Sequence, residues 1–293
     1  MKTLTIFTPT YNRAYILPKL YDSLKNQTSK DFSWLIVDDG SIDDTGSLVK
    51  GWQNESILEI EYIYQKNGGK MRAHNVGVNN CKTKLFFCVD SDDYLTNNAI
   101  ETILQQYTKN DGLIQSDKAG FIAYKGSDAN HPIGTEFPKG LTISTLGGIY
   151  SKGFKGDTSL IFKTDVIKQY PFEVVDGEKF ITENSSYYKI DQKYKYYLIR
   201  DVLIICSYLE DGYTKASEKL KKNNPLGYVN YYNMLICNEK KLFKKIKYSI
   251  ALGEVLFLAK LKNKLNYCKN KFLFVITSPC AYLVYLKRRK YAK

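Results

Sequence analysis

Residues 85–93, with the sequence LFFCVDSDD, change abruptly from an apolar run to a group of acids. The run Leu85–Val89 is strongly apolar, which is typical of a short buried strand. The strand is predicted to stop at Asp90, because three of the four residues 90–93 are carboxylates, and burying them without partners would be costly. We therefore predict a strand whose carboxyl end carries a cluster of polar side chains.

Two earlier apolar segments end in the same way. Leu4–Thr8 is predicted to be a strand that ends at Pro9 and is followed by Thr10-Tyr11-Asn12-Arg13. Trp34–Val37 is predicted to be a second strand, followed at once by Asp38-Asp39-Gly40-Ser41. One Asp-x-Asp sequence alone would be a weak signal, because turns favour Asp. Three polar clusters at three strand ends indicate a site, with helix caps and a solvated acidic turn as the alternatives.

Helical segments separate these strands. Residues 16–27 carry apolar side chains at helical spacing, residues 71–80 form a second helical stretch, and Glu61–Gln65 is a further short strand. This alternation predicts an α/β fold with a mostly parallel, twisted sheet flanked by helices. Ligands of such sheets bind beyond the carboxyl ends of the strands, where we expect the three clusters to meet. Residues 101–215 are less regular, and the chain from 216 is mostly helical.

The excess positive charge lies in the last fifth of the chain. The net charge is +13, and residues 240–293 contain 15 Lys or Arg but one acid, Glu254. The other 239 residues carry 28 basic and 29 acidic side chains. This asymmetry indicates a catalytic body with a basic tail. We expect no nucleic-acid partner, because acids at the strand ends would repel a phosphate backbone.

The number and spacing of cysteines and histidines indicate which metal sites and which cellular compartment to expect. The six cysteines form no Cys-x-x-Cys pair, and His74 and His131 are the only histidines. We therefore predict neither a zinc site nor a disulfide framework. Residues 3–8 are predicted to form a strand directly, so we expect no signal peptide and a cytoplasmic location.

The basic tail contains two apolar stretches. In residues 242–265 apolar side chains alternate with lysines, and residues 272–286 hold no charge but include Pro279. A bilayer-spanning helix needs about 20 apolar residues, so we expect none here. Lysines beside apolar faces suit a helix in the interface of an anionic membrane, which predicts peripheral contact with the inner face of the plasma membrane. A helical cap on the catalytic domain and an oligomer contact are the alternatives.

The chain resembles glycosyltransferase family 2, which has a GT-A fold, and most of all its bacterial capsule and surface-polysaccharide members. The similar segments are TIFTPTYNR (5–13), WLIVDDGSIDDT (34–45), NGGKMRAHNVGV (67–78), FFCVDSDDYL (86–95), FITENSSYYKI (180–190) and YLEDGYT (208–214). The resemblance implies that residues 1–100 bind a nucleotide sugar and residues 101–215 form the acceptor half. Residues 216–293 are then a basic helical C-terminal extension.

The acids after the fourth strand suggest a metal. Asp90, Ser91 and Asp92 form an Asp-x-Asp motif, and a hard divalent cation prefers carboxylate oxygens. Mn²⁺ or Mg²⁺ held here would bridge the diphosphate of the donor and neutralise the leaving group. Asp92 is the strongest candidate ligand and Asp90 the second. Asp93 either binds the metal too or caps the next helix.

Other residues are predicted to hold the donor. Tyr11 offers a flat face for a pyrimidine base, and Pro9 and Thr10 shape the edge of that pocket. The resemblance implies that Asp39 accepts a hydrogen bond from a uracil-type ring. Lys70, in a glycine-rich loop ahead of a helix, is predicted to contact the diphosphate.

The helix that follows Lys70 flanks the donor ribose and diphosphate in this family, which makes Asn75 a candidate contact. Many family members have Arg where this chain has His74. The role of His74 is therefore open between the donor site and the protein interior.

The resemblance also places a catalytic base. In an inverting transfer a carboxylate removes the proton of the acceptor hydroxyl as it attacks the anomeric carbon. Glu183, in the segment FITEN, matches that base. The neighbouring acids Asp176, Glu178 and Asp191 are alternatives, and Asp157 is predicted to line the acceptor side.

Together these features predict an inverting, metal-dependent glycosyltransferase. It would move a sugar from a nucleotide diphosphate, UDP in particular, to a hydroxyl of a glycan or lipid-linked acceptor in surface polysaccharide synthesis. One alternative is a sugar nucleotidyltransferase, although Pro9–Arg13 stands where that class has a glycine-rich basic loop. The other is a non-enzymatic basic module that binds membranes or nucleic acid, which leaves the acidic strand ends unexplained.

Overall fold

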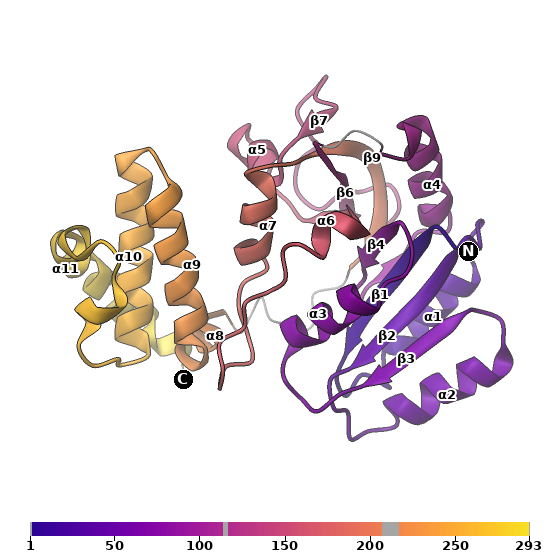
Figure 1. Ribbon diagram of the computed structural model, residues 1–293, viewed down its shortest axis with the longest axis horizontal. Coiled ribbons are helices and arrows are strands. Elements are labelled where there is room, and N and C mark those ends of the chain that lie inside the picture. Colours follow the sequence, from indigo (N-terminus) through magenta and orange to yellow (C-terminus); the bar gives the residue numbers. More distant parts are fainter. Residues whose placement is uncertain (1, 114–116, 207–216, 293) are drawn as a thin grey trace. The chain divides into compact units, whose positions relative to one another are not determined.

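The computed structural model describes residues 2–113, 117–206 and 217–292 (Figure 1). The contacts group the chain into two units, a first of Met1–Phe172 with Ser186–Tyr208 and a second of Glu173–Ser185 with Leu209–Lys293. The segment YLEDGYT at 208–214 lies outside the described residues. Residues 1–100 and most of 101–215, predicted as two halves of one domain, share the first unit. The short segment Glu173–Ser185 instead groups with the C-terminal helices, which the sequence did not indicate.

In the described part of the first unit, nine strands form one sheet in the order β3-β2-β1-β4-β8-β6-β9-β5, with β7 paired to β9 (Figure 1). The strands are β1 (Leu4–Thr10), β2 (Phe32–Asp38), β3 (Ile60–Tyr64), β4 (Leu85–Cys88), β5 (Tyr94–Leu95), β6 (Lys118–Gly126), β7 (Ile143–Ser144), β8 (Thr158–Lys163) and β9 (Lys195–Ile205).

The first four strands form the predicted parallel sheet. β1 lies between β2 and β4 and pairs in parallel with both, and β2 pairs in parallel with β3. β1 continues through Pro9 to Thr10, two residues beyond its predicted end. The backbone N–H groups of successive β1 residues point alternately toward β2 and toward β4. Pro9 is tolerated because it falls on the β4 side, where the β1–β4 pairing already ends at Phe7. The missing N–H of Pro9 therefore interrupts no hydrogen-bonded pair.

The second half of the sheet is mixed, so the sheet as a whole is less parallel than the sequence predicts. β8 is antiparallel to both β4 and β6, whereas β6 and β9 are parallel. The short strands β5 and β7 are each antiparallel to β9. These strands come from the irregular region after residue 100, where hydrophobic periodicity is weak. The fold remains α/β, with helices flanking a central sheet.

Helices cover both faces of the parallel part (Figure 1). One face packs Trp34 of β2 against Tyr21 and Trp52, whose rings stack. The other face places Phe7 of β1 against the helix that begins at Lys70. The first unit contains α1 (Leu17–Lys25), α2 (Thr45–Glu55), α3 (Lys70–Asn80), α4 (Ala99–Lys109), the 3₁₀ helix η1 (Asp111–Leu113), α5 (Leu146–Ser151), α6 (Thr164–Ile167) and all but the first two residues of α7 (Asn184–Asp191).

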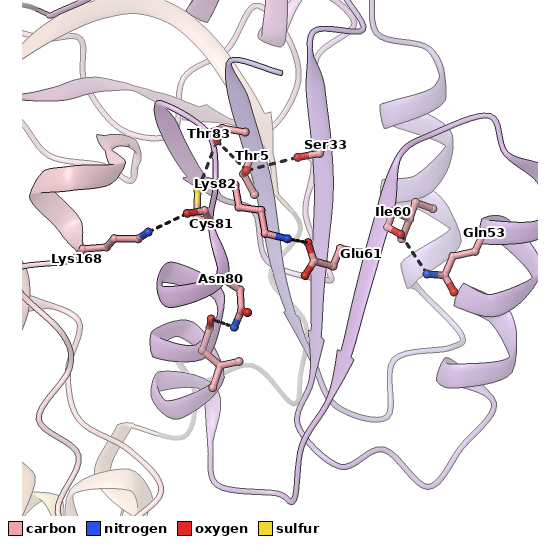
Figure 2. Close-up of polar contacts among 11 residues, drawn as sticks. Thr5, Ser33, Gln53, Ile60, Glu61, Asn80, Cys81, Lys82, Thr83 and Lys168 are labelled. Atoms are coloured by element: carbon pink, nitrogen blue, oxygen red, sulfur yellow. Dashed lines mark hydrogen bonds and ion pairs between the residues drawn. The ribbon is translucent and has the colours of Figure 1, made fainter. Parts of the chain in front are cut away.

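Hydroxyl groups tie the strands together at their amino ends (Figure 2). The Thr5 Oγ1 atom lies 2.8 Å from Thr83 Oγ1 and 3.5 Å from Ser33 Oγ, which links β1 to β2 and to the start of β4. Lys168 donates to the carbonyl of Cys81 at 2.9 Å. These contacts fix the register of the parallel strands at the edge opposite the acidic clusters.

The second unit is helical. A buried charge network joins three of its helices: Glu254 lies 3.2 Å from Arg288 and 3.7 Å from Lys221. Lys221 and Arg288 also pair with Glu218. None of the helices described is both long and apolar enough to cross a membrane. The helices are α8 (Ser217–Asn223), α9 (Pro225–Asn238), α10 (Leu242–Leu258), η2 (Lys264–Tyr267), α11 (Lys271–Arg288) and η3 (Arg289–Ala292).

Candidate active site

The three polar clusters meet at one edge of the sheet, as predicted, because β1, β2 and β4 are neighbours that run in the same direction. The loops after β1 and β2 are tied to each other. The Asn12 N–H donates to Ser41 Oγ at 2.8 Å, and the Ile42 N–H donates to Asn12 Oδ1 at 2.8 Å. Tyr11 keeps 47% of its surface exposed on this fixed loop. Its ring is therefore available to a ligand without a change of backbone.

Asp39 holds the glycine-rich loop in front of α3. Its carboxylate accepts hydrogen bonds from the backbone N–H groups of Gly68 and Gly69, at 2.8 and 2.7 Å, and from the Gln65 amide at 2.7 Å. Gly69 has a backbone φ of +96°, a conformation that residues other than glycine rarely adopt. Asp39 thus fixes the loop that carries Lys70. Its predicted contact with a base stays a prediction, and two carboxylate oxygens retain capacity for one more donor.

The three acids after β4 have different environments. Lys70 Nζ lies 2.8 Å from Asp90, and Lys125 Nζ lies 2.7 Å from the buried Asp93. Asp92 is half-buried, and no ion pair to it is found in the described parts of the chain. Burial and the charge of Asp90 raise the pKa of Asp92. Asp92 is therefore the acid whose charge is least compensated by the protein.

The pKa values of the other two acids follow from their partners. Burial would raise the pKa of Asp90, but Lys70 and Lys125 outweigh it and hold this pKa below its ordinary value. Burial raises the pKa of Asp93 to about 6, although Lys125 opposes the shift. The lysine pairs thus keep Asp90 ionised and anchor Asp93.

Lys125 was not found by sequence reasoning. It lies on β6, 32 residues after Asp93. β8 pairs with both β4 and β6, which brings Lys125 into the same sheet as the strand that Asp93 follows. A lone lysine in an irregular region gives no local signal of such a contact. Because this ion pair engages one oxygen of Asp93, we propose a structural role for that residue, and its predicted metal contact stays a prediction. The metal prediction then rests on Asp90 and Asp92.

These two carboxylates fit a divalent cation that is shared with a ligand. In the described residues no group of three or more His, Cys, Asp or Glu side chains gathers around one point. Mg²⁺ commonly uses one or two carboxylates and completes its shell with water and substrate phosphates. The charge of Asp92, which burial and the neighbouring Asp90 disfavour, is the feature that a cation would relieve.

The remaining predicted donor contacts divide into two groups. Pro9, Thr10 and Ser91 are buried at the same sheet edge, and the Thr10 hydroxyl has no hydrogen-bond partner within the described chain. Asn75 instead forms a two-way pair with the backbone of Phe172, donating at 2.8 Å and accepting at 2.9 Å. Its amide is therefore engaged in holding the chain at Phe172, and its predicted contact with the donor stays a prediction.

His74 belongs to the protein interior. It is 4% exposed, and its ring makes edge contacts with Phe7, Phe86 and Phe172. Neither ring nitrogen has a hydrogen-bond partner in the described chain. Burial, assisted by the nearby charge of Lys70, lowers the pKa of His74 to about 3. The ring therefore stays neutral at ordinary pH.

This environment predicts acid-sensitive stability. The imidazole of the unfolded chain takes up a proton below pH 6.5, whereas the folded ring does so only near pH 3, so stability falls as the pH drops below 6.5. Between pH 7 and 5 the wild type should lose about 2 kcal/mol more than a His74→Leu variant, which has no titrating group. Urea unfolding at the two pH values measures the difference, and equal losses in both proteins would contradict it.

Two of the alternative base candidates serve as helix caps. Glu178 accepts from the N–H groups of Leu226 and Gly227 at the start of α9, at 2.6 and 2.8 Å. Asp191 accepts from Leu146 and Gly147 at the start of α5, at 3.0 and 2.6 Å. Carboxylates are favoured at helix amino ends, where N–H groups lack intrahelical partners. These two contacts explain both acids without a catalytic role.

Glu183 and Asp157 are the residues predicted for the acceptor side. Glu183 is half-buried at the end of the segment Glu173–Ser185, immediately before α7. Asp157 is exposed, and its carbonyl accepts from the Lys125 N–H at 3.3 Å, next to the Lys125–Asp93 pair. The roles predicted for both residues stay predictions.

Comparisons with known proteins identify the family. The profile of glycosyl transferase family 2 matches residues 5–170. The GalNAc(5)-diNAcBac-PP-undecaprenol beta-1,3-glucosyltransferase of Campylobacter jejuni is 26% identical over 253 residues, which are 85% of this chain and 78% of that protein.

Two solved structures share the fold. S. aureus TarS 1-349 in complex with UDP-GlcNAc has a TM-score of 0.63 at 16% identity, over 99% of this chain and 92% of that one. The mannosyltransferase PcManGT from Pyrobaculum calidifontis, in complex with GDP-Man and Mn²⁺, has a TM-score of 0.57 at 16% identity, over 99% and 84%. The family match covers more than half of the chain and includes all three polar clusters and the Asp39-held glycine loop. The chain therefore belongs to glycosyltransferase family 2 and is a glycosyltransferase with a GT-A fold.

Proposed function

We propose that this enzyme transfers a sugar, with inversion, from a uridine diphosphate donor to a hydroxyl of a lipid-linked or polymeric acceptor in surface glycan synthesis. The observation that carries the proposal is the half-buried Asp92 carboxylate beside Asp90, which has no ion pair within the described chain and lies at the sheet edge where Asp39 fixes the glycine loop of Lys70. A diphosphate with its cation matches this combination of negative side chains and an ammonium group at the amino end of α3.

In the proposed donor complex, the base stacks on the exposed ring of Tyr11, next to Pro9 and Thr10. Asp39 accepts a hydrogen bond from the base and keeps the glycine loop in place. Lys70, which pairs with Asp90 in this structure, would turn its ammonium toward the diphosphate. Mn²⁺ or Mg²⁺, held by Asp90 and Asp92, would supply charge neutralisation of the leaving nucleotide.

We propose Glu183 as the base for the acceptor hydroxyl. Its support is the family resemblance of the segment FITEN and the helix-cap contacts that account for Glu178 and Asp191. Asp157 is the proposed acceptor-side residue. The acceptor class is supported by the C. jejuni relative, whose name places an undecaprenol-linked glycan as its acceptor. We further propose that the enzyme is cytoplasmic and contacts the anionic inner face of the plasma membrane.

The donor proposal is tested by calorimetric titration of UDP into the protein. Binding should weaken at least about tenfold when Mn²⁺ is replaced by EDTA, because the carboxylates then repel the diphosphate. An Asp92→Asn variant should show little difference between the two conditions. Equal affinity of the wild type with metal and with EDTA would contradict the metal role. A panel of UDP-sugars, scored by protection against thermal unfolding, would then identify the donor sugar.

A further inference from the structure

Helix α11 is apolar on two opposite faces. Its inner face packs on α10, where Thr277 Oγ1 lies 2.7 Å from Ser249 Oγ, and Ala281 is fully buried against Gly253. Its outer face, defined here as Phe272, Val275, Ile276, Leu283 and Leu286, is exposed to solvent. Phe272 retains 78% of its surface and Leu283 66%. One face of α11 is therefore explained by the helical bundle and the other is not.

The outer-face residues form one continuous row. Counted from Phe272, the other four lie three, four, eleven and fourteen residues further along, offsets that return to the same side of an α-helix. From Phe272 to Leu286 the row is about 20 Å long, at a rise of about 1.5 Å per residue. Single apolar side chains scattered over a protein surface are normal, whereas a contiguous apolar row of this length is not.

The charges around this row select the kind of partner. Lys271 precedes it, and Lys287, Arg289 and Lys290 follow it, so cations stand at both ends. The one acid of residues 240–293, Glu254, is 2% exposed and faces Arg288 and Lys221. An apolar row with cationic ends complements anionic lipid, whose head groups attract the cations while the acyl boundary takes the apolar side chains. Two copies of the same cationic segment would repel each other.

We propose that the outer face of α11 is the membrane-binding surface, with the helix lying parallel to an anionic bilayer and its apolar row buried at the acyl boundary. No helix among those described could cross a bilayer, so contact is made from one side. The inference rests on the proposed peripheral location. It does not depend on the transfer reaction, because vesicle binding needs neither donor nor acceptor. Such contact would bring the enzyme to a lipid-linked acceptor.

Co-sedimentation with vesicles tests the proposal. The full chain is mixed with vesicles of phosphatidylcholine alone or with 30% phosphatidylglycerol, at about 0.1 M salt. The wild type should pellet with the anionic vesicles and stay in solution with the neutral ones. An Ile276→Glu/Leu283→Glu variant should lose at least about tenfold in partitioning, because two charges would enter the acyl boundary. Both side chains are exposed, so its thermal unfolding should match that of the wild type.

The matched control is Ile57→Glu/Tyr64→Glu, which adds the same two charges at exposed apolar positions of the first unit and should bind vesicles like the wild type. Unchanged vesicle binding by the double variant would overturn the proposal, as would absence of wild-type binding to anionic vesicles. Size-exclusion chromatography with light scattering adds a further check. If the wild type is an oligomer that the double variant dissociates, a second copy covers this face and the proposal is wrong.

Discussion

Replacing Asp92 with Asn is expected to lower kcat/KM for glycosyl transfer at least about a hundredfold, while the unfolding temperature stays close to that of the wild type. A metal ion that neutralises a leaving group contributes several kcal/mol to transition-state stabilisation, and each 1.36 kcal/mol is a factor of about ten in rate. The Asp92 carboxylate makes no ion pair within the described chain, and burial and Asp90 disfavour its charge. Removing that charge should therefore cost function without costing stability.

Asp93→Asn provides the contrast, because Asp93 differs from Asp92 in its partner and not in its chemistry. Asp93 forms a buried ion pair with Lys125 at 2.7 Å. Leaving that lysine buried without its partner should reduce the free energy of unfolding by about 3 kcal/mol, measured by urea unfolding. A double Asp93→Asn/Lys125→Met variant should recover much of the loss, because both charges are then absent.

The two variants separate a metal ligand from a structural acid. Near-normal turnover of the Asp92→Asn enzyme at saturating Mn²⁺ would show that the cation is not held there. Loss of stability in Asp92→Asn with little loss in Asp93→Asn would show that the two assignments are reversed. Each measurement therefore tests one carboxylate of a motif that looks uniform in the sequence.

The sequence was sufficient to predict that the three polar clusters meet at one edge of the sheet. Apolar runs such as Leu85–Val89 are local signals, and a polar cluster directly after each run marks the edge at which parallel strands end. The neighbour relationship of β1, β2 and β4 then followed from the α/β topology. These features depend on short stretches of chain, which is why they could be predicted without knowledge of tertiary contacts.

The use of individual side chains could not be predicted from the same pattern. The carboxylate of Asp39 and the amide of Asn75 can bind either a ligand or the protein backbone. In the structure the Asn75 amide binds the backbone of Phe172, and the Asp39 carboxylate accepts hydrogen bonds from the glycine loop. Lys125 reaches Asp93 only because β8 and β6 return beside β4. These contacts join distant segments, so no local spacing encodes them.

The prediction for His74 illustrates the same limit from the opposite direction. In the sequence it lies in the motif after Lys70, where a polar residue suggests a ligand contact. In the structure the helical spacing turns it toward Phe7 and Phe172, away from any hydrogen-bond partner in the described chain. The role of His74 depends on which face of α3 packs on the sheet. Because His74 is itself a polar residue on the buried face, the hydrophobic pattern of the sequence does not reveal that face.

The second large effect concerns Glu183. A Glu183→Gln variant is expected to lose about three orders of magnitude in kcat, because general-base catalysis contributes about 10²–10⁴-fold and Gln cannot accept the proton. Its affinity for UDP, measured by calorimetry with Mn²⁺, should remain within about twofold of the wild type, since a base for the acceptor hydroxyl is not needed to bind the nucleotide. This combination distinguishes loss of a base from loss of the donor site.

Two neighbouring acids serve as controls. Glu178→Gln should weaken the cap of α9 and lower the free energy of unfolding by about 1 kcal/mol, with kcat of the folded enzyme nearly unchanged. Asp176→Asn, which changes the third alternative base, should retain near-normal kcat. If Asp176→Asn abolishes transfer with UDP binding intact while Glu183→Gln remains active, Asp176 is the base and our assignment of Glu183 is wrong.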